Sequence, residues 1–218
     1  MACLLDVASD GSVNSRKTQG ELTMTSKELR NSQRFLRNEF TCVGRYNIPM
    51  IHKQAIDLNE VELIAISDTR PNDVKNRHKG VHHFTDDRQF ESEYNAPERT
   101  LPKLSQYRFL CTPQFSCYAE MPTWRQIEST AKNHWVGAFW QSQGLYVATS
   151  LCWGLATSFD FCFDGIERGS IVAVGTLGCR KSKGSFMFGY ETEESEADAY
   201  INATEAIWKL SSVARSIV

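Results

Sequence analysis

Four acidic side chains stand where they could perform chemistry together. Each follows a predicted strand or lies in the loop after one, and carboxylates gathered at one sheet edge can hold Mg²⁺ or Mn²⁺. The same groups can act as general acid and base where burial separates their pKa values. The alternative is that an Asp after a strand simply caps the next turn. We predict that four acids are catalytic: Asp68, Asp86, Asp87 and Glu120. Of these, Asp86 and Asp87 are also predicted to be metal ligands.

A basic loop after a buried apolar strand, predicted over 170–177, is a second candidate site. The loop reads Thr176-Leu-Gly-Cys-Arg-Lys-Ser-Lys-Gly184. Backbone N–H groups in a glycine-containing loop can bind an anion, although the GxxxxGK[ST] spacing of a P-loop is absent. A solvated basic turn is the alternative. We predict that phosphate is bound by Gly178, Arg180, Lys181 and Lys183.

A basic face marks the helix predicted over 25–40. Arg30, Arg34 and Arg37 recur at spacings of three and four, which places them on one side of a helix. We predict that they contact nucleic acid or a protein partner, and a solvated basic face is the alternative.

These candidates need elements that bring them to one edge. Predicted strands alternate with helical patterns, which favours an α/β fold with a mostly parallel sheet of about six strands, open or resembling an incomplete barrel. Ligands of such sheets bind beyond the carboxyl ends of the strands. Helices are predicted over 25–40, 122–133 and 157–169. The strands are predicted over 61–67, 80–85, 107–112, 134–140, 145–153 and 170–177.

Polarity along the chain indicates its organisation. Residues 1–23 are expected to be a disordered extension, 24–190 a single α/β domain, and 191–218 a helical tail. A translation start at Met24 is a further expectation.

Composition excludes several classes of protein. The chain has 218 residues, 41% of them hydrophobic, and a formal net charge of −2. This is globular composition, so fibrous and wholly disordered proteins are excluded, and nucleic acid could be bound only by a local basic patch. The composition predicts no oligomeric state.

Cysteine content and hydropathy indicate the compartment. Seven cysteines form an odd set with no CxxC pair, which is typical of buried free thiols in a reducing cytoplasm and speaks against zinc. No run approaches the roughly 18 apolar residues of a membrane span. We expect a cytoplasmic protein without a membrane partner.

Several long motifs occur in order and resemble the domain of unknown function 4417 family over about residues 35–190. They are Tyr118-Ala-Glu-Met-Pro-Thr-Trp-Arg-Gln-Ile-Glu-Ser, Trp140-Gln-Ser, Phe161-Cys-Phe-Asp-Gly-Ile-Glu-Arg-Gly-Ser and Thr176-Leu-Gly-Cys. The resemblance implies a setting among phages, plasmids and other bacterial mobile elements, and it implies no particular reaction.

The chain departs from the family pattern at three places. Gln114 stands where an acid is common, residues 1–23 have no counterpart, and the sequence diverges after Tyr190. A frameshift, truncation or recombined end would explain the last departure.

Two functions are therefore expected as alternatives. One is a metal-assisted hydrolase or binder of a phosphate-containing substrate such as a nucleotide or nucleic acid. The other is a non-catalytic replication, maintenance or host-interaction factor that acts through its basic N-terminal helix.

Overall fold

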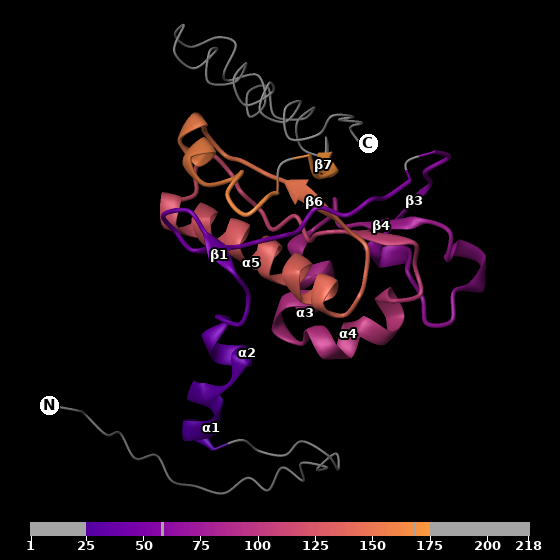
Figure 1. The fold of residues 1–218 in the computed structure, drawn as a ribbon, viewed down its shortest axis with the longest axis horizontal. Helices are drawn as coiled ribbons and strands as arrows, with labels where there is room; N and C mark the ends of the chain where they lie inside the picture. The colour runs from indigo at the N-terminus through magenta and orange to yellow at the C-terminus, as the bar shows by residue number, and fades with distance from the viewer. Residues whose placement is uncertain (1–24, 58, 168, 175–218) are drawn as a thin grey trace, which may run out of the picture. The chain divides into compact units, whose positions relative to one another are not determined.

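The computed structural model describes residues 25–57, 59–167 and 169–174 (Figure 1). By their internal contacts these residues divide into a unit up to Leu36 and a unit from Arg37 onward. The predicted N-terminal extension, the basic loop from Gly178 to Lys183 and the predicted tail 191–218 lie outside the described residues.

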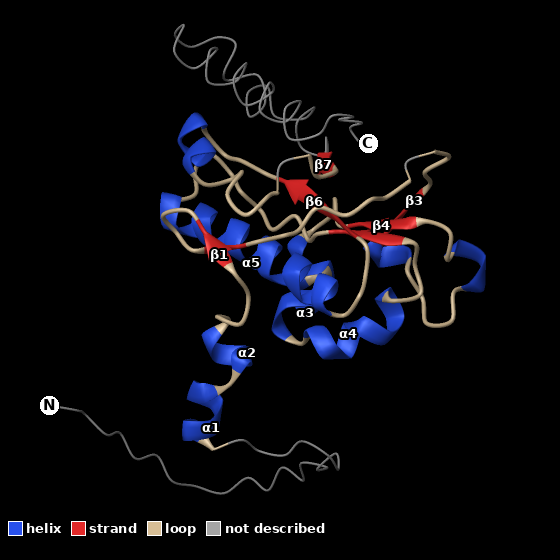
Figure 2. Cartoon of the chain, in the orientation of Figure 1, coloured by secondary structure: helices blue, strands red, loops and turns tan. Residues whose placement is uncertain are grey.

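The larger unit is built on a parallel sheet, and its strands pair in the order in which they occur along the chain (Figure 2). Registers such as Val81 with Leu110 and Ser150 with Ala173 are all parallel. The predicted α/β class with a mostly parallel sheet is confirmed. The five strands of this sheet are β3 (Leu63–Ala65), β4 (Gly80–His82), β5 (Phe109–Cys111), β6 (Val147–Leu151) and β7 (Val172–Val174).

Sequential strand order places the connecting helices on one face. Parallel crossovers are right-handed, so steps in one direction across the sheet put every connection on the same side. Val81, Leu110 and Val147 accordingly pack in one core cluster with Leu104 and Trp140 from the helices. Residues of the opposite pleat form a second cluster. The helices of this unit are α3 (Glu91–Asn95), α4 (Pro97–Leu104) and α5 (Thr123–Ser142).

The prediction of a strand over 134–140 is wrong, because these residues form part of the second half of α5. Every residue from His134 to Trp140 is buried, so the segment reads as a continuous apolar run. Such a run does not distinguish a buried strand from a helix buried on all sides. Gly137 lets the helix approach closely: a Cβ there would lie 2.6 Å from Ile51 Cδ1 and 2.7 Å from Thr112 Cγ2.

Two predicted helices are also corrected. The helix over 25–40 is instead two short helices, α1 (Ser26–Asn31) and α2 (Gln33–Leu36), separated by an extended Ser32. The helix over 157–169 is replaced by a 3-10 helix, Ala156–Asp160, followed by turns. A small antiparallel pair, β1 (Cys42–Val43) and β2 (Ile48–Pro49), forms where no strand was predicted.

Strands β3 to β6 are shorter than expected, and 3-10 helices follow two of them. Ile66–Asp68 follows β3 and Asp87–Gln89 follows β4 after a short turn. A further 3-10 helix, Val74–Asn76, lies in the connection between these two strands.

Two histidines belong to the core as neutral groups. His83 and His134 are fully buried, and the Nδ1–H of each donates to a backbone carbonyl, of Cys111 at 2.7 Å and of Pro49 at 3.0 Å respectively. Burial disfavours the charged imidazolium and lowers the pKa of His83 to about 3 and that of His134 to about 4.

These depressed pKa values predict a loss of stability in acid. In the unfolded chain these histidines become protonated below about pH 6.5, whereas in the folded chain they become protonated only at about pH 3 or 4. The free energy of unfolding therefore falls as the pH falls through this window. Between pH 7 and pH 5 each histidine should remove about 2 kcal/mol. His83→Asn is expected to flatten the pH dependence of urea unfolding by about this amount.

The matched control is His78→Asn, because the imidazole of His78 is 58% exposed and lies 3.7 Å from Glu62. Its pH slope should stay close to that of the native chain. An unchanged slope in the His83 variant would contradict a buried, neutral His83.

Candidate functional site

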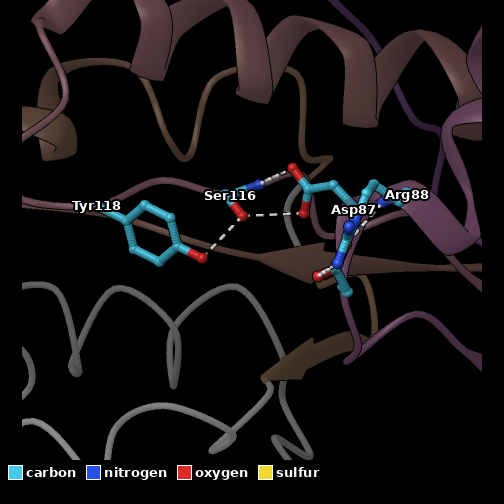
Figure 3. A network of polar contacts seen from close by, with 5 residues as sticks. Asp87, Arg88, Ser116 and Tyr118 are labelled. Atoms are coloured by element: carbon cyan, nitrogen blue, oxygen red, sulfur yellow. Dashed lines mark hydrogen bonds and ion pairs between the residues drawn. The ribbon is translucent and has the colours of Figure 1, made fainter.

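A polar network joins the carboxyl ends of β4 and β5 (Figure 3). Asp87 Oδ2 accepts the backbone N–H of Ser116 at 3.0 Å, and Asp87 Oδ1 accepts the Ser116 hydroxyl at 2.9 Å. The hydroxyls of Ser116 and Tyr118 are 3.1 Å apart. Because the Ser116 proton is directed at Asp87, Tyr118 donates to Ser116 Oγ.

Two groups of the network can make further contacts, the carboxylate of Asp87 and the ring of Tyr118. A carboxylate oxygen has two lone pairs, so each oxygen of Asp87 can accept one further bond, from a proton or from a cation. Asp87 is partly buried, whereas Tyr118 is 62% exposed. The arrangement can therefore polarise the Ser116 hydroxyl, ligate a divalent cation through Asp87, and stack a flat ring on Tyr118.

A triangle of buried hydrogen bonds among Thr112, Asn133 and Ser150 supports this edge of the sheet. Thr112 Oγ1 donates to Asn133 Oδ1 at 2.8 Å and accepts the backbone N–H of Ser150 at 2.7 Å. Asn133 Nδ2 donates to the Ser150 carbonyl at 2.9 Å. Helix α5 is thereby tied to the ends of β5 and β6, from which the loops of the site depart.

The structure does not bring the four predicted acids together. Asp86 caps the 3-10 helix by accepting the Arg88 N–H at 3.0 Å and pairs with the Arg88 guanidinium at 2.9 Å. Hydrogen bonds from Arg88 lower the pKa of Asp86. Asp68 and Glu120 are exposed, and Asp68 lies 3.5 Å from its neighbour Ser67 Oγ.

Metal-ligating side chains are correspondingly sparse. In the part of the chain that the structure describes, no three His, Cys, Asp or Glu side chains are grouped closely enough to hold a metal ion. A cation at Asp87 would thus take its other ligands from substrate and water, as Mg²⁺ often does.

The three predicted arginines occupy different environments. Arg30 and Arg34 are exposed on α1 and α2. Arg37 has a left-handed backbone with φ +50°, and its guanidinium lies 3.8 Å over the Trp135 ring and 4.5 Å over the Tyr94 ring. It also donates to the Tyr94 carbonyl at 2.6 Å. This charge is engaged within the larger unit.

Sequence reasoning missed two thiols at the same edge. Cys117 lies in the loop after β5, and Cys152 directly follows β6. Both line a small cavity of about 10 Å³, which is room for one water molecule. The rule that selected the acids, polar groups just after parallel strands, would have selected these cysteines had it been applied to them.

No helix in the described residues combines the length and apolar character that crossing a membrane requires. The predicted phosphate-binding residues Gly178, Arg180, Lys181 and Lys183 lie outside the described residues.

Comparison with known proteins identifies phage relatives. The chain is 38% identical over 149 residues to a Gene 1 protein of Mycobacterium phage L5, covering 68% of this chain and 64% of that protein. It is 42% identical over 103 residues to a Gene 1 protein of Mycobacterium phage D29, covering 47% of this chain and 38% of that protein. The chain thus spans about two thirds or less of these relatives. No solved structure matches it.

A family match confirms the resemblance found in the motifs. The family model covers residues 40–196, which include the whole parallel sheet and the Asp87 network. The chain therefore belongs to the family described as Domain of unknown function (DUF4417).

Proposed function

We propose that this phage-related protein binds a phosphate-containing ligand, together with Mg²⁺ or Mn²⁺, at the carboxyl edge of its parallel sheet, and that it hydrolyses that ligand. The observation that carries the proposal is the hydrogen-bonded network of Asp87, Ser116 and Tyr118 (Figure 3). It unites a partly buried carboxylate, a polarised hydroxyl and an exposed aromatic ring at the edge where α/β sheets bind ligands.

Each group has a distinct role in the proposal. Asp87 is the protein's carboxylate ligand to the cation, which orients the phosphate and activates water. Ser116 fixes the direction of that carboxylate through its N–H and hydroxyl. Tyr118 offers a face on which a nucleobase can stack, and this favours nucleotides over inorganic phosphate.

Chain connectivity supports a contribution from the basic loop. Strand β7 is parallel to β6 and lies next to it, so the chain leaves β7 after Val174 at the same edge of the sheet. Gly178, Arg180, Lys181 and Lys183 follow within ten residues and remain our proposal for phosphate contacts. Asp86 is left out of the proposed cation site, because its oxygens already pair with Arg88.

Replacing Asp87 by Asn is expected to abolish ligand-dependent stabilisation. A ligand that binds only the folded state stabilises it by about 2.7 kcal/mol at a hundred times its Kd. Thermal melts of the full chain with MgCl₂ or MnCl₂ plus a nucleoside diphosphate measure this effect as a rise in Tm. The native chain should show the rise and Asp87→Asn should not, because the amide loses the charge that holds the cation.

Asp86→Asn is the matched control, since it removes the same charge one residue away. It should retain the rise in Tm. Melts without ligand verify that each variant folds, and an equal rise in both variants, or none in the native chain, would refute a site at Asp87.

The second candidate, a non-catalytic factor that binds DNA, is supported by a different observation. Lys27, Arg30 and Arg34 are all exposed on α1 and α2. Within the described residues none of them forms an ion pair with an acid, so their charges are available to phosphates.

Neutralising Arg30 and Arg34 to Gln should weaken DNA binding if this candidate is right. Each lost phosphate contact lowers the salt dependence of log K by about one, so the double variant should lower it by about two. Fluorescence anisotropy of a labelled duplex across a salt series measures this slope. Arg88→Gln is the control, since it removes an exposed arginine that pairs with Asp86. An unchanged slope in the double variant would exclude these contacts.

A further inference from the structure

Two cysteines lie just beyond the ends of the neighbouring strands β5 and β6. Cys117 and Cys152 line one small cavity. Both are free thiols. Cys117 is 7% exposed, whereas Cys152 is more accessible. The pair is next to the Asp87 network and shares no side chain with it.

The neighbours of Cys152 favour its ionised form. The Cys117 thiol, the Gln114 side chain and the Cys117 backbone N–H lower the pKa of Cys152, while burial and the nearby charge of Asp87 oppose the effect. A thiolate, the nucleophilic form of cysteine, is therefore favoured at Cys152.

Hydrogen bonds between the two loops hold the thiols together. Gln126 Oε1 lies 3.6 Å from Cys117 Sγ and accepts the Ser158 hydroxyl at 2.6 Å. Ser158 Oγ in turn accepts the N–H groups of Gly154 and Leu155, at 3.1 and 3.2 Å, just beyond Cys152. The segments that carry the two sulfurs are thus tied through one glutamine and one serine.

The other described cysteines lack this environment. Cys162 lines the same cavity, but burial raises its pKa. Burial also raises the pKa of Cys42, and it raises that of Cys111 to about 12. These three remain thiols at neutral pH, so Cys152 is the nucleophile of the set and Cys117 is its neighbour.

We infer that Cys117 and Cys152 form a peroxide-sensitive dithiol in which Cys152 is oxidised first and Cys117 resolves it to a disulfide. In the first step the Cys152 thiolate attacks hydrogen peroxide, the O–O bond breaks, and Cys152 sulfenic acid and hydroxide form. In the second step the Cys117 sulfur attacks the sulfenic sulfur, the S–O bond breaks, and the disulfide and water form. Sulfur is oxidised and peroxide reduced by two electrons, and a dithiol reductant reverses the result.

The disulfide would have a structural consequence near the proposed ligand site. It would join the loop after β5 to the end of β6 covalently, one residue from Ser116. The inference does not require ligand binding, so it can fail or hold independently of the proposed function.

The test exposes the purified full chain to hydrogen peroxide, blocks the remaining thiols under denaturing conditions, and maps peptides without reduction. The seven cysteines should yield five blocked thiols and one Cys117–Cys152 crosslink that a dithiol reductant removes. A crosslink of Cys152 to Cys162, crosslinks only between chains, or seven blocked thiols would overturn the inference.

Two variants separate the roles of the sulfurs. Cys117→Ser should accumulate sulfenic acid at Cys152, trapped by dimedone, because the resolving thiol is missing. Cys152→Ser should leave Cys117 unmodified. Cys42→Ser is the matched control and should form the native crosslink. Equal dimedone labelling of Cys117 in the Cys152 variant would overturn the assignment, and the peptide map of the native chain decides the question if a variant does not fold.

Discussion

The side chain of Asn133 holds the ends of β5 and β6 in place, and the candidate sites depend on that attachment. Its amide bonds to the hydroxyl of Thr112 and to the carbonyl of Ser150, and Thr112 in turn binds the Ser150 N–H. All three residues are buried. A buried hydrogen bond contributes only about 1 kcal/mol net, but an orphaned partner costs about 1–3 kcal/mol, so the triangle is costly to break. It fixes the position from which the loops bearing Ser116, Cys117 and Cys152 depart.

Strand order explains why chemistry gathers at this edge. With all neighbours parallel and consecutive, every strand ends on the same side and every loop after a strand begins there. The strands themselves are only three to five residues long. The short sheet thus positions the loops, and the contacts between loops, Asp87 with Ser116 and Cys117 with Cys152, determine which side chains meet.

The sequence predicted the sheet better than it predicted the site. Five of the six predicted strands contain a strand of the sheet, because short runs of strand-forming residues bounded by turn residues leave a clear local signal. The run over 134–140 carried the same signal and is helix, since only tertiary packing distinguishes the two. Local pattern also could not reveal that Arg37 stacks on Trp135, 98 residues away in the chain, or that Asp87 bonds to Ser116, 29 residues away.

The negative charge of Asp87 has opposite effects in the two proposals. Its negative charge is what would hold a cation, and the same charge raises the pKa of Cys152 and so opposes the thiolate. Removing the charge should therefore weaken a cation site while leaving the sulfur at least as reactive toward peroxide. A cation bound at Asp87 would act on the sulfur in the same direction, because it neutralises the charge that disfavours the thiolate. Linkage is reciprocal, so a Cys152 thiolate would in turn strengthen cation binding at Asp87, whereas a disulfide, which carries no charge, would not.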